Sequence, residues 1–127
     1  MVNLPWRKGN TVFSAEERVR FVHNATRALG NVQVEPFSTL LVDFARERGA
    51  MAIVKGLRAI SDFEYELEMN QLNRRQAPDV ESVYLMASPK YSFLSSSGVK
   101  ELATFGGNLT DLVPDEVAEA LKERLGR

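Results

Sequence analysis

Three consecutive serines stand directly before a helical pattern and could bind an anion. Ser95, Ser96 and Ser97 open a segment predicted to be helical as far as Phe105, and Lys100 follows within about a turn. The first-turn amides of a helix lack intrahelical partners, and the helix dipole adds partial positive charge there. Hydroxyls and free amides together suit a phosphate group. The competing interpretation is that one serine caps the helix and the others are solvated.

A second candidate site consists of two cations around a glycine. Residues 52–55 form a short apolar run, predicted to be a strand that ends at Gly56. Glycine lets a ligand approach the backbone closely. Lys55 and Arg58 would place positive charge at the carboxyl end of this strand, where parallel sheets bind ligands. The alternative is an ordinary turn with two solvent-exposed cations.

Acidic side chains open the next helical pattern, predicted over residues 62–75. Acids near a helix N-terminus interact favourably with the helix dipole, so a solvated helix face explains most of them. Glu66 and Glu68 lie on different faces and cannot both serve one site. A carboxylate facing a cleft could accept a hydrogen bond from a ribose hydroxyl or an adenine amine. These acids are therefore weaker indications than the serines and the cations.

Two further segments carry polar chemistry. Arg7 and Lys8 lie in an irregular N-terminal segment and could reach a phosphate or a magnesium-bound oxygen, although a surface loop is the simpler interpretation. His23 falls inside the first predicted helix without an acid or serine nearby in the sequence, so we expect it to be structural or surface-exposed.

Composition excludes several classes of protein. The 127 residues suit one domain, and the net charge of −1 gives no general reason to expect nucleic-acid or membrane binding. The absence of cysteine excludes disulfides, cysteine nucleophiles and thiolate metal sites. No apolar run approaches the roughly 18 residues of a membrane span, and no signal peptide opens the chain. We expect an intracellular, cytoplasmic protein.

The elements that must position these residues alternate along the chain. A capping box at Ser14 and Glu17 predicts a helix to Leu29, which Gly30 ends. The remaining pattern predicts strands at 32–36, 52–55 and 81–86, and helices at 38–49 with Ser38 as cap, 62–75, 95–105 and from Pro114 onwards. Such alternation predicts an α/β protein with parallel strands and crossover helices. No full strand comes first, and three strands make a thin sheet compared with the usual ~4–6.

Two long motifs resemble signatures of bacterial phosphopantetheine adenylyltransferases. Residues 53–66 are similar to the family's central signature, and residues 91–101 to its serine-rich nucleotidyltransferase motif. Shorter matches at 13–19, 40–44 and 112–114 extend the resemblance to nearly the whole chain. The resemblance implies a Rossmann-like nucleotidyltransferase fold in a single domain over residues 1–127.

The resemblance also implies an activity and a set of site residues. Members transfer the adenylyl group of ATP to 4'-phosphopantetheine, giving dephospho-coenzyme A and pyrophosphate, with Mg²⁺, as cytoplasmic hexamers. The implied ATP contacts are Gly56, Leu57, Arg58, Glu66, Tyr91, Ser92, Phe93, Leu94, Ser95, Ser96 and Ser97. The implied contacts to the second substrate are Lys8, Leu41 and Lys55. Lys8, or Arg7 in its place, and Arg58 are expected to carry the catalysis, and no side chain is expected to bind a metal.

The sequence departs from the family at its start. A first strand, a Gly-Ser-Phe-Asp-Pro turn and a Thr-x-Gly-His helix start are absent, and His23 does not replace that histidine. We expect a missing strand-loop-helix unit of about 30 residues that includes a central strand, so that activity is impaired and sheet edges are unpaired. A wrongly assigned gene start or a truncation explains this, as does a degenerate paralogue, and the intact signatures favour the former. The alternatives to the enzyme are an inactive nucleotide- or coenzyme A-binding paralogue or fragment, and a purely structural α/β partner.

Overall fold

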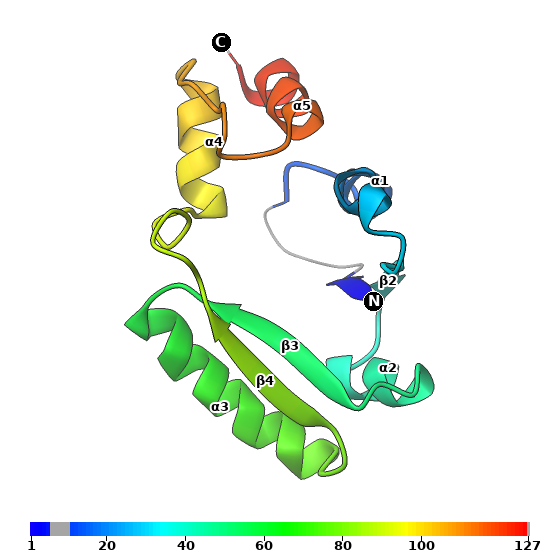
Figure 1. Ribbon diagram of the computed structural model, residues 1–127. Coiled ribbons are helices and arrows are strands. Elements are labelled where there is room, and N and C mark those ends of the chain that lie inside the picture. Colours follow the sequence, from blue (N-terminus) through cyan, green and yellow to red (C-terminus); the bar gives the residue numbers. More distant parts are fainter. Residues whose placement is uncertain (6–10, 127) are drawn as a thin grey trace. The chain divides into compact units, whose positions relative to one another are not determined.

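The structure is a computed structural model that describes residues 1–5 and 11–126, and the chain divides into two compact units. Unit 1 comprises Met1–Ser38 and Leu94–Arg127, and unit 2 comprises Thr39–Phe93. In each unit two parallel strands are joined by a crossover helix, which is the α/β organisation that the sequence predicts (Figure 1). In the part of the chain that the structure describes, no helix has the length and apolar character needed to cross a membrane.

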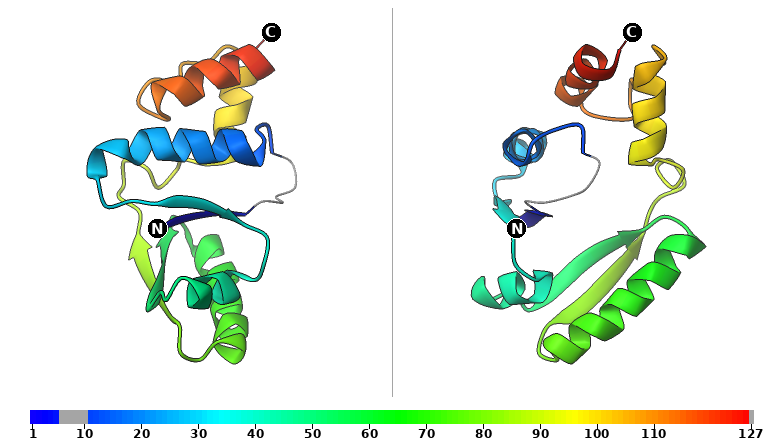
Figure 2. Two further views of the ribbon diagram at one scale, coloured as in Figure 1. Left: turned by 90° about the vertical axis from the view of Figure 1, so that its right-hand side faces the viewer. Right: turned by 180° about the vertical axis from the view of Figure 1, so that it is seen from behind.

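Unit 1 begins with a parallel strand pair. Strand β1 (Val2–Pro5) pairs with β2 (Val34–Phe37), with Val2 opposite Val34. The connection consists of α1 (Ala15–Thr26) and the short helix η1 (Arg27–Leu29), and Figure 2 shows α1 on one side of this pair. Unit 1 is completed by α4 (Ser96–Thr104) and α5 (Asp115–Leu125).

The start of α1 is held by the predicted capping box. The hydroxyl of Ser14 accepts from the backbone N–H of Glu17 at 3.2 Å, and the carboxylate of Glu17 accepts from the backbone N–H of Ser14 at 2.8 Å. Arg124 of α5 donates to both oxygens of the same carboxylate, at 2.8 and 2.9 Å. The η1 segment ends at Gly30, whose φ of +70° lies in the left-handed region that favours glycine. One acid thus caps α1 and joins it to α5.

The core of unit 1 lies between α4 and α5. It is built on the buried side chains of Val99, Ala103, Leu109 and Leu121. Ser95 caps α4, because its hydroxyl accepts from the backbone N–H of Gly98 at 3.2 Å. These contacts fix where the serine-rich segment enters its helix.

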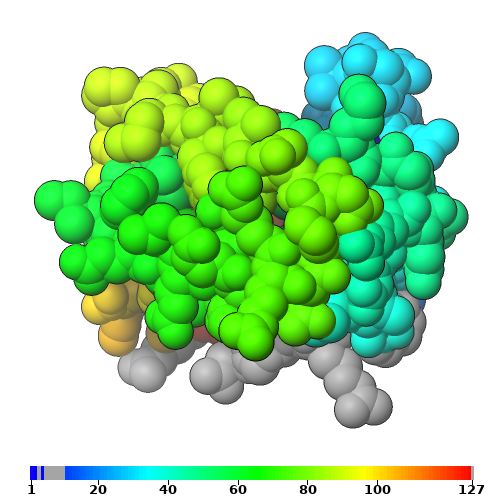
Figure 3. Space-filling model, turned by 90° about the horizontal axis from the view of Figure 1, so that it is seen from below, coloured from blue at the N-terminus to red at the C-terminus, as the bar shows by residue number. Residues whose placement is uncertain are grey.

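Unit 2 contains α2 (Leu41–Glu47), β3 (Ala52–Leu57), α3 (Ile60–Gln76) and β4 (Glu81–Met86). The two strands pair in parallel along their full length, from Ala52 opposite Glu81 to Leu57 opposite Met86. A small core of Val42, Ala45, Ala77 and Val80 packs against Ile53. Helix α3 is the crossover between the strands, and none of its own residues is buried, so its side chains occupy much of the surface in Figure 3.

Several predicted boundaries were wrong. Gly56 lies inside β3 and pairs with Leu85, whereas the strand was predicted to end at Gly56. The described residues form four strands in two pairs, because the segment at Val2–Pro5 is a strand where no full strand was predicted. The N-cap of α2 is Leu40, without a side-chain cap, so Ser38 does not cap it. Pro114 is the N-cap of α5 and not a residue of its first turn.

Candidate active site

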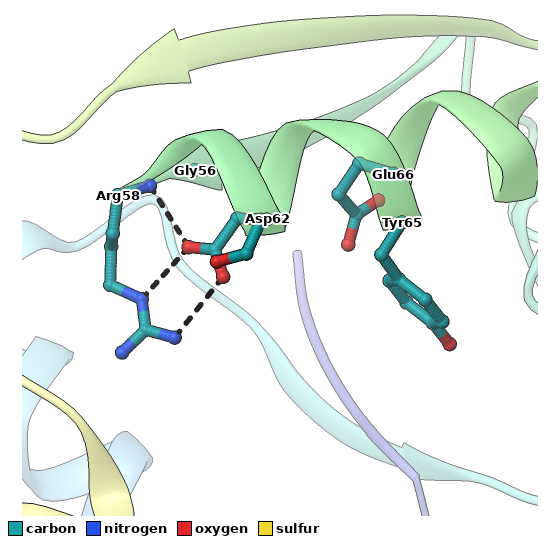
Figure 4. A pocket seen from close by; sticks show the side chains of 6 residues that line it. Gly56, Arg58, Asp62, Tyr65 and Glu66 are labelled. Carbon is teal, nitrogen blue, oxygen red and sulfur yellow. Dashed lines mark hydrogen bonds and ion pairs between the residues drawn. The ribbon is translucent and has the colours of Figure 1, made fainter.

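A cavity of about 300 Å³ opens in unit 2 where β3 leads into α3 (Figure 4). This is the carboxyl end of a parallel strand, the edge where α/β proteins bind ligands. Its lining residues come from that strand, the turn after it and the first two turns of the helix: Gly56, Arg58, Ser61, Asp62, Tyr65 and Glu66. Three predicted ATP contacts, Gly56, Arg58 and Glu66, are therefore brought together.

Arg58 is bound to Asp62, one helical turn along the chain. The Nε of Arg58 donates to Asp62 Oδ2 at 3.1 Å, and its Nη2 donates to Oδ1 at 3.5 Å. The backbone N–H of Arg58 donates to Oδ2 at 3.0 Å. The side-chain hydrogen bond from Arg58, followed by the backbone hydrogen bond, lowers the pKa of Asp62 below its ordinary value. Asp62 is therefore ionised at neutral pH and fixes the guanidinium beside the cavity.

Lys55 is bound to Glu66, one of the residues that line the cavity. The Nζ of Lys55 lies 2.7 Å from Glu66 Oε2, and the two side chains are only 19% and 21% exposed. The hydroxyl of Tyr84, on the neighbouring strand, donates to the backbone carbonyl of Glu66 at 3.3 Å. In Figure 4 the side chains of Asp62 and Glu66 extend from the same side of α3. One face of the helix thus carries two carboxylates, each paired with a cation.

Gly56 and Leu57 can meet a ligand through the backbone. A Cβ built on Gly56 would have no atom within 4 Å, so the glycine leaves open space beside the strand. The side chain of Leu57 is buried, with 4% of its surface exposed. Both residues were predicted ATP contacts, and their main chain is the part that a nucleotide could approach.

The turn after β4 carries three more predicted ATP contacts. Tyr91, Ser92 and Phe93 follow the strand in unit 2, where the hydroxyl of Ser92 donates to the Pro89 carbonyl at 3.2 Å. The aromatic rings are 45% exposed at Tyr91 and 71% exposed at Phe93. Exposed aromatic faces suit stacking on an adenine base. Lys90 lies 5.1 Å from the centre of the Tyr91 ring.

The predicted serine turn belongs to unit 1 and is described there by itself. Ser95 is the N-cap of α4, so the capping interpretation is confirmed for this residue. Ser96 and Ser97 are the first two residues of the helix and are exposed, while Leu94 packs against the core of unit 1. The helix start therefore has the geometry expected of an anion-binding segment, and its role in binding ATP stays a prediction.

Other predicted site residues were not tested. Leu41 is the first residue of α2 and is half-buried. Lys8 and Arg7 lie outside the described residues. His23 is exposed near the end of α1, as expected of a surface residue.

Three further residues complete the lining of the cavity and were not predicted as site residues: Ser61, Asp62 and Tyr65. A signal for Asp62 was present, because Arg58 and Asp62 are four residues apart, a spacing that brings side chains together at a helix start. The prediction for most acids of this segment is a solvated helix face. That interpretation is correct for Glu64 and Glu68, which are exposed.

Comparison with known proteins identifies the family. A cytidylyltransferase-like family model matches residues 1–102. The chain is 57% identical over 118 residues to a phosphopantetheine adenylyltransferase of Thermomicrobium roseum, a match that covers 93% of this chain and 71% of that relative. Proteins of the same name from Thermodesulfovibrio yellowstonii and Moorella thermoacetica are 51% and 53% identical, over 92% and 91% of this chain and 73% and 72% of the relatives. Identity of more than half over at least 91% of this chain means that the chain belongs to the phosphopantetheine adenylyltransferase family.

Proposed function

We propose that this chain binds ATP and 4'-phosphopantetheine and transfers the adenylyl group between them, as a step of coenzyme A biosynthesis. The observation that carries the proposal is the cavity at the end of β3, where Arg58 and the open backbone at Gly56 lie together. A guanidinium presents several donors in a plane and suits phosphate oxygens. The chain's membership of the family supplies the two substrates.

The reaction is an in-line displacement at the α-phosphorus of ATP. An oxygen of the 4'-phosphate forms a bond to that phosphorus, and the bond to the oxygen that bridges to the β-phosphorus breaks. Pyrophosphate leaves with the electron pair of the broken bond, and the acceptor becomes dephospho-coenzyme A. No side chain forms a covalent intermediate, so the protein contributes positioning and charge stabilisation.

Different side chains bind ATP and the acceptor. Arg58 contacts phosphate oxygens of ATP and stabilises the charge that builds up on them. Lys55 contacts the phosphate of the acceptor, which requires it to share its charge with Glu66 at 2.7 Å. Tyr91 and Phe93 stack on the base, and Ser95 to Ser97 bind phosphate at the start of α4. Leu41 and Lys8 bind the acceptor on the same proposal.

Magnesium is proposed to arrive with the nucleotide. Among the described residues there is no group of three or more side chains that could hold a metal ion. The two carboxylates of the cavity, Asp62 and Glu66, are each paired with a cation. Such pairs do not fit a protein-held Mg²⁺ site, whereas Mg²⁺ commonly binds to phosphates and retains several waters. Assembly as a hexamer and residence in the cytoplasm are part of the same proposal and come from the family resemblance.

Calorimetric titration with Mg–ATP tests the role of the cavity. Arg58→Ala removes a charged hydrogen-bond donor and is expected to weaken ATP binding by about tenfold or more. Arg75→Ala is the matched control, because Arg75 is an exposed arginine in the last turn of α3 and does not line the cavity. Equal affinity in the parent chain and in Arg58→Ala, or no binding by the parent chain, would contradict the proposal.

A further inference from the structure

The carboxylate of Asp62 is held by hydrogen bonds to Arg58. Asp62 lies at the third position of α3, and its side chain is 26% exposed. Its oxygens accept three hydrogen bonds from Arg58, one from the backbone N–H and two from the guanidinium. Both residues line the same cavity.

Asp62 also holds the backbone that leads into α3. The N-cap of α3 is Ala59, which has no side chain that could accept a hydrogen bond, so no side-chain cap is present. Asp62 reaches back past the N-cap and accepts from the backbone N–H of Arg58, one residue before the amide that the acid of a capping box binds.

We infer that Asp62 is a positioning residue, which holds both the main chain and the guanidinium of Arg58 in the orientation that receives a phosphate. The inference rests on the proposed function, because it gives Arg58 the role of the phosphate ligand. Oδ2 accepts from both the backbone N–H and Nε, so the chain entering α3 and the side chain are fixed by one atom. A guanidinium held in this way loses less rotamer freedom when it binds a phosphate.

Electrostatic repulsion alone predicts the opposite effect of Asp62 on ATP binding, and this difference makes the inference testable. A carboxylate close to a phosphate site repels the ligand, so a purely electrostatic view predicts that removal of Asp62 tightens ATP binding. Asp62→Asn keeps the shape and one oxygen acceptor and removes the charge. If Asp62 positions Arg58, this variant weakens ATP binding by about three- to tenfold and raises KM more than it lowers kcat.

A double-mutant cycle with Arg58→Ala separates positioning from direct contact. If Asp62 acts through Arg58, then Asp62→Asn changes the Kd for ATP by less than about twofold once Arg58 is absent. Asp115→Asn is the matched control, because Asp115 is a first-turn acid of α5, another helix without a side-chain cap. Tighter binding by Asp62→Asn, or the same loss in both backgrounds, would overturn the inference. Failure of the parent chain to bind ATP would instead overturn the proposed function, and the role of Asp62 with it.

The pairing itself can be measured without a ligand. The Nε–H of Arg58, assigned by nuclear magnetic resonance through its loss in Arg58→Lys, is expected to exchange with water more slowly than that of the exposed Arg75. This measurement applies to the parent chain and so does not depend on the folding of any Asp62 variant. Equal exchange rates for the two arginines would overturn the inference.

Discussion

At the scale of single residues, ligand binding in the cavity is proposed to depend on a positive charge and on open space beside the backbone. Arg58 supplies charge and is held by three hydrogen bonds to Asp62. Gly56 supplies space, because a side chain at that position would point into volume that no protein atom occupies within 4 Å. The proposed site therefore needs an arginine whose side chain is held in one orientation and a residue without a side chain at position 56.

Substitution of Gly56 tests the need for space. Gly56→Ala is expected to leave the thermal midpoint within about 2 °C of the parent, because the added methyl meets no neighbour. The Kd for ATP is expected to rise by about fivefold or more, because the methyl occupies volume beside the backbone that the nucleotide approaches. Ala52→Val, which also enlarges an exposed residue of β3, is the control and should bind ATP like the parent. Unchanged ATP affinity in Gly56→Ala would show that no ligand approaches there.

Glu17 gives unit 1 a defined dependence on pH. The hydrogen bond from Arg124, followed by that from the Ser14 backbone, lowers the pKa of Glu17 from its ordinary 4.5 to about 2. The fold therefore stabilises the ionised carboxylate. Its contribution is fully present above about pH 4.5 and is lost as the pH falls towards about 2.

Thermal unfolding of Glu17→Gln checks this dependence. The variant should unfold at a lower temperature than the parent at pH 7, and the difference should shrink as the pH falls from about 4.5 towards about 2. Glu16→Gln removes the neighbouring exposed acid of the same turn and serves as the control. A difference between parent and Glu17→Gln that stays constant over this pH range is incompatible with the account.

At the scale of elements, α3 is joined to the two strands of unit 2 by polar contacts. Lys55 of β3 pairs with Glu66, and Tyr84 of β4 donates to the carbonyl of the same residue. None of the residues of α3 is buried, so these contacts do part of the work that an apolar face does in other crossover helices. These contacts orient α3, whose first two turns line the cavity.

A double-mutant cycle measures the coupling of α3 to β3. Lys55→Met and Glu66→Gln should each lower the free energy of unfolding by about 1–2 kcal/mol, because each leaves a partly buried partner without its counter-ion. The double variant should lose less than the sum of the two. The more exposed pair Arg46 and Asp79 is the control and should show weaker coupling. Additive losses at Lys55 and Glu66 would mean that the pair does not join the elements.

The packing of α4 against α5 is tested at Leu109. This side chain is fully buried in the core of unit 1, so Leu109→Ala should lower the free energy of unfolding by about 2–5 kcal/mol. Leu102→Ala, at a position that is 42% exposed, should cost less than about 1 kcal/mol. Urea denaturation measures both free energies of unfolding. Similar losses for the two variants would mean that Leu109 is not part of the core of unit 1.

At the scale of the whole molecule, the sequence predicted the α/β organisation and most elements. The bounds of β4 agree with the prediction, because its alternating pattern lies between turn residues. Gly56 was misplaced, because its low strand propensity is overridden by pairing with Leu85. No full strand was predicted at β1, because a segment of four residues ending in Pro5 has little strand character of its own and depends on pairing with β2.

The candidate site was predicted unevenly for a similar reason. Residue types and spacing indicated Arg58 and Gly56, because cations and glycines after a strand are local signals. The pairing of Lys55 with Glu66 was not predicted, because it joins residues eleven positions apart and depends on how α3 folds back on β3. A local sequence pattern cannot predict contacts that form only when distant parts of the chain pack together.

The most direct test of the central claim follows the phosphorus atoms of ATP. The chain is incubated with 4'-phosphopantetheine and Mg–ATP that carries ³²P in either the α or the γ position. The account predicts that α-label appears in dephospho-coenzyme A and γ-label in pyrophosphate, and that both transfers fall in Arg58→Ala but not in Arg75→Ala. Transfer of γ-label to the acceptor, or release of neither labelled product by the parent chain, would contradict it.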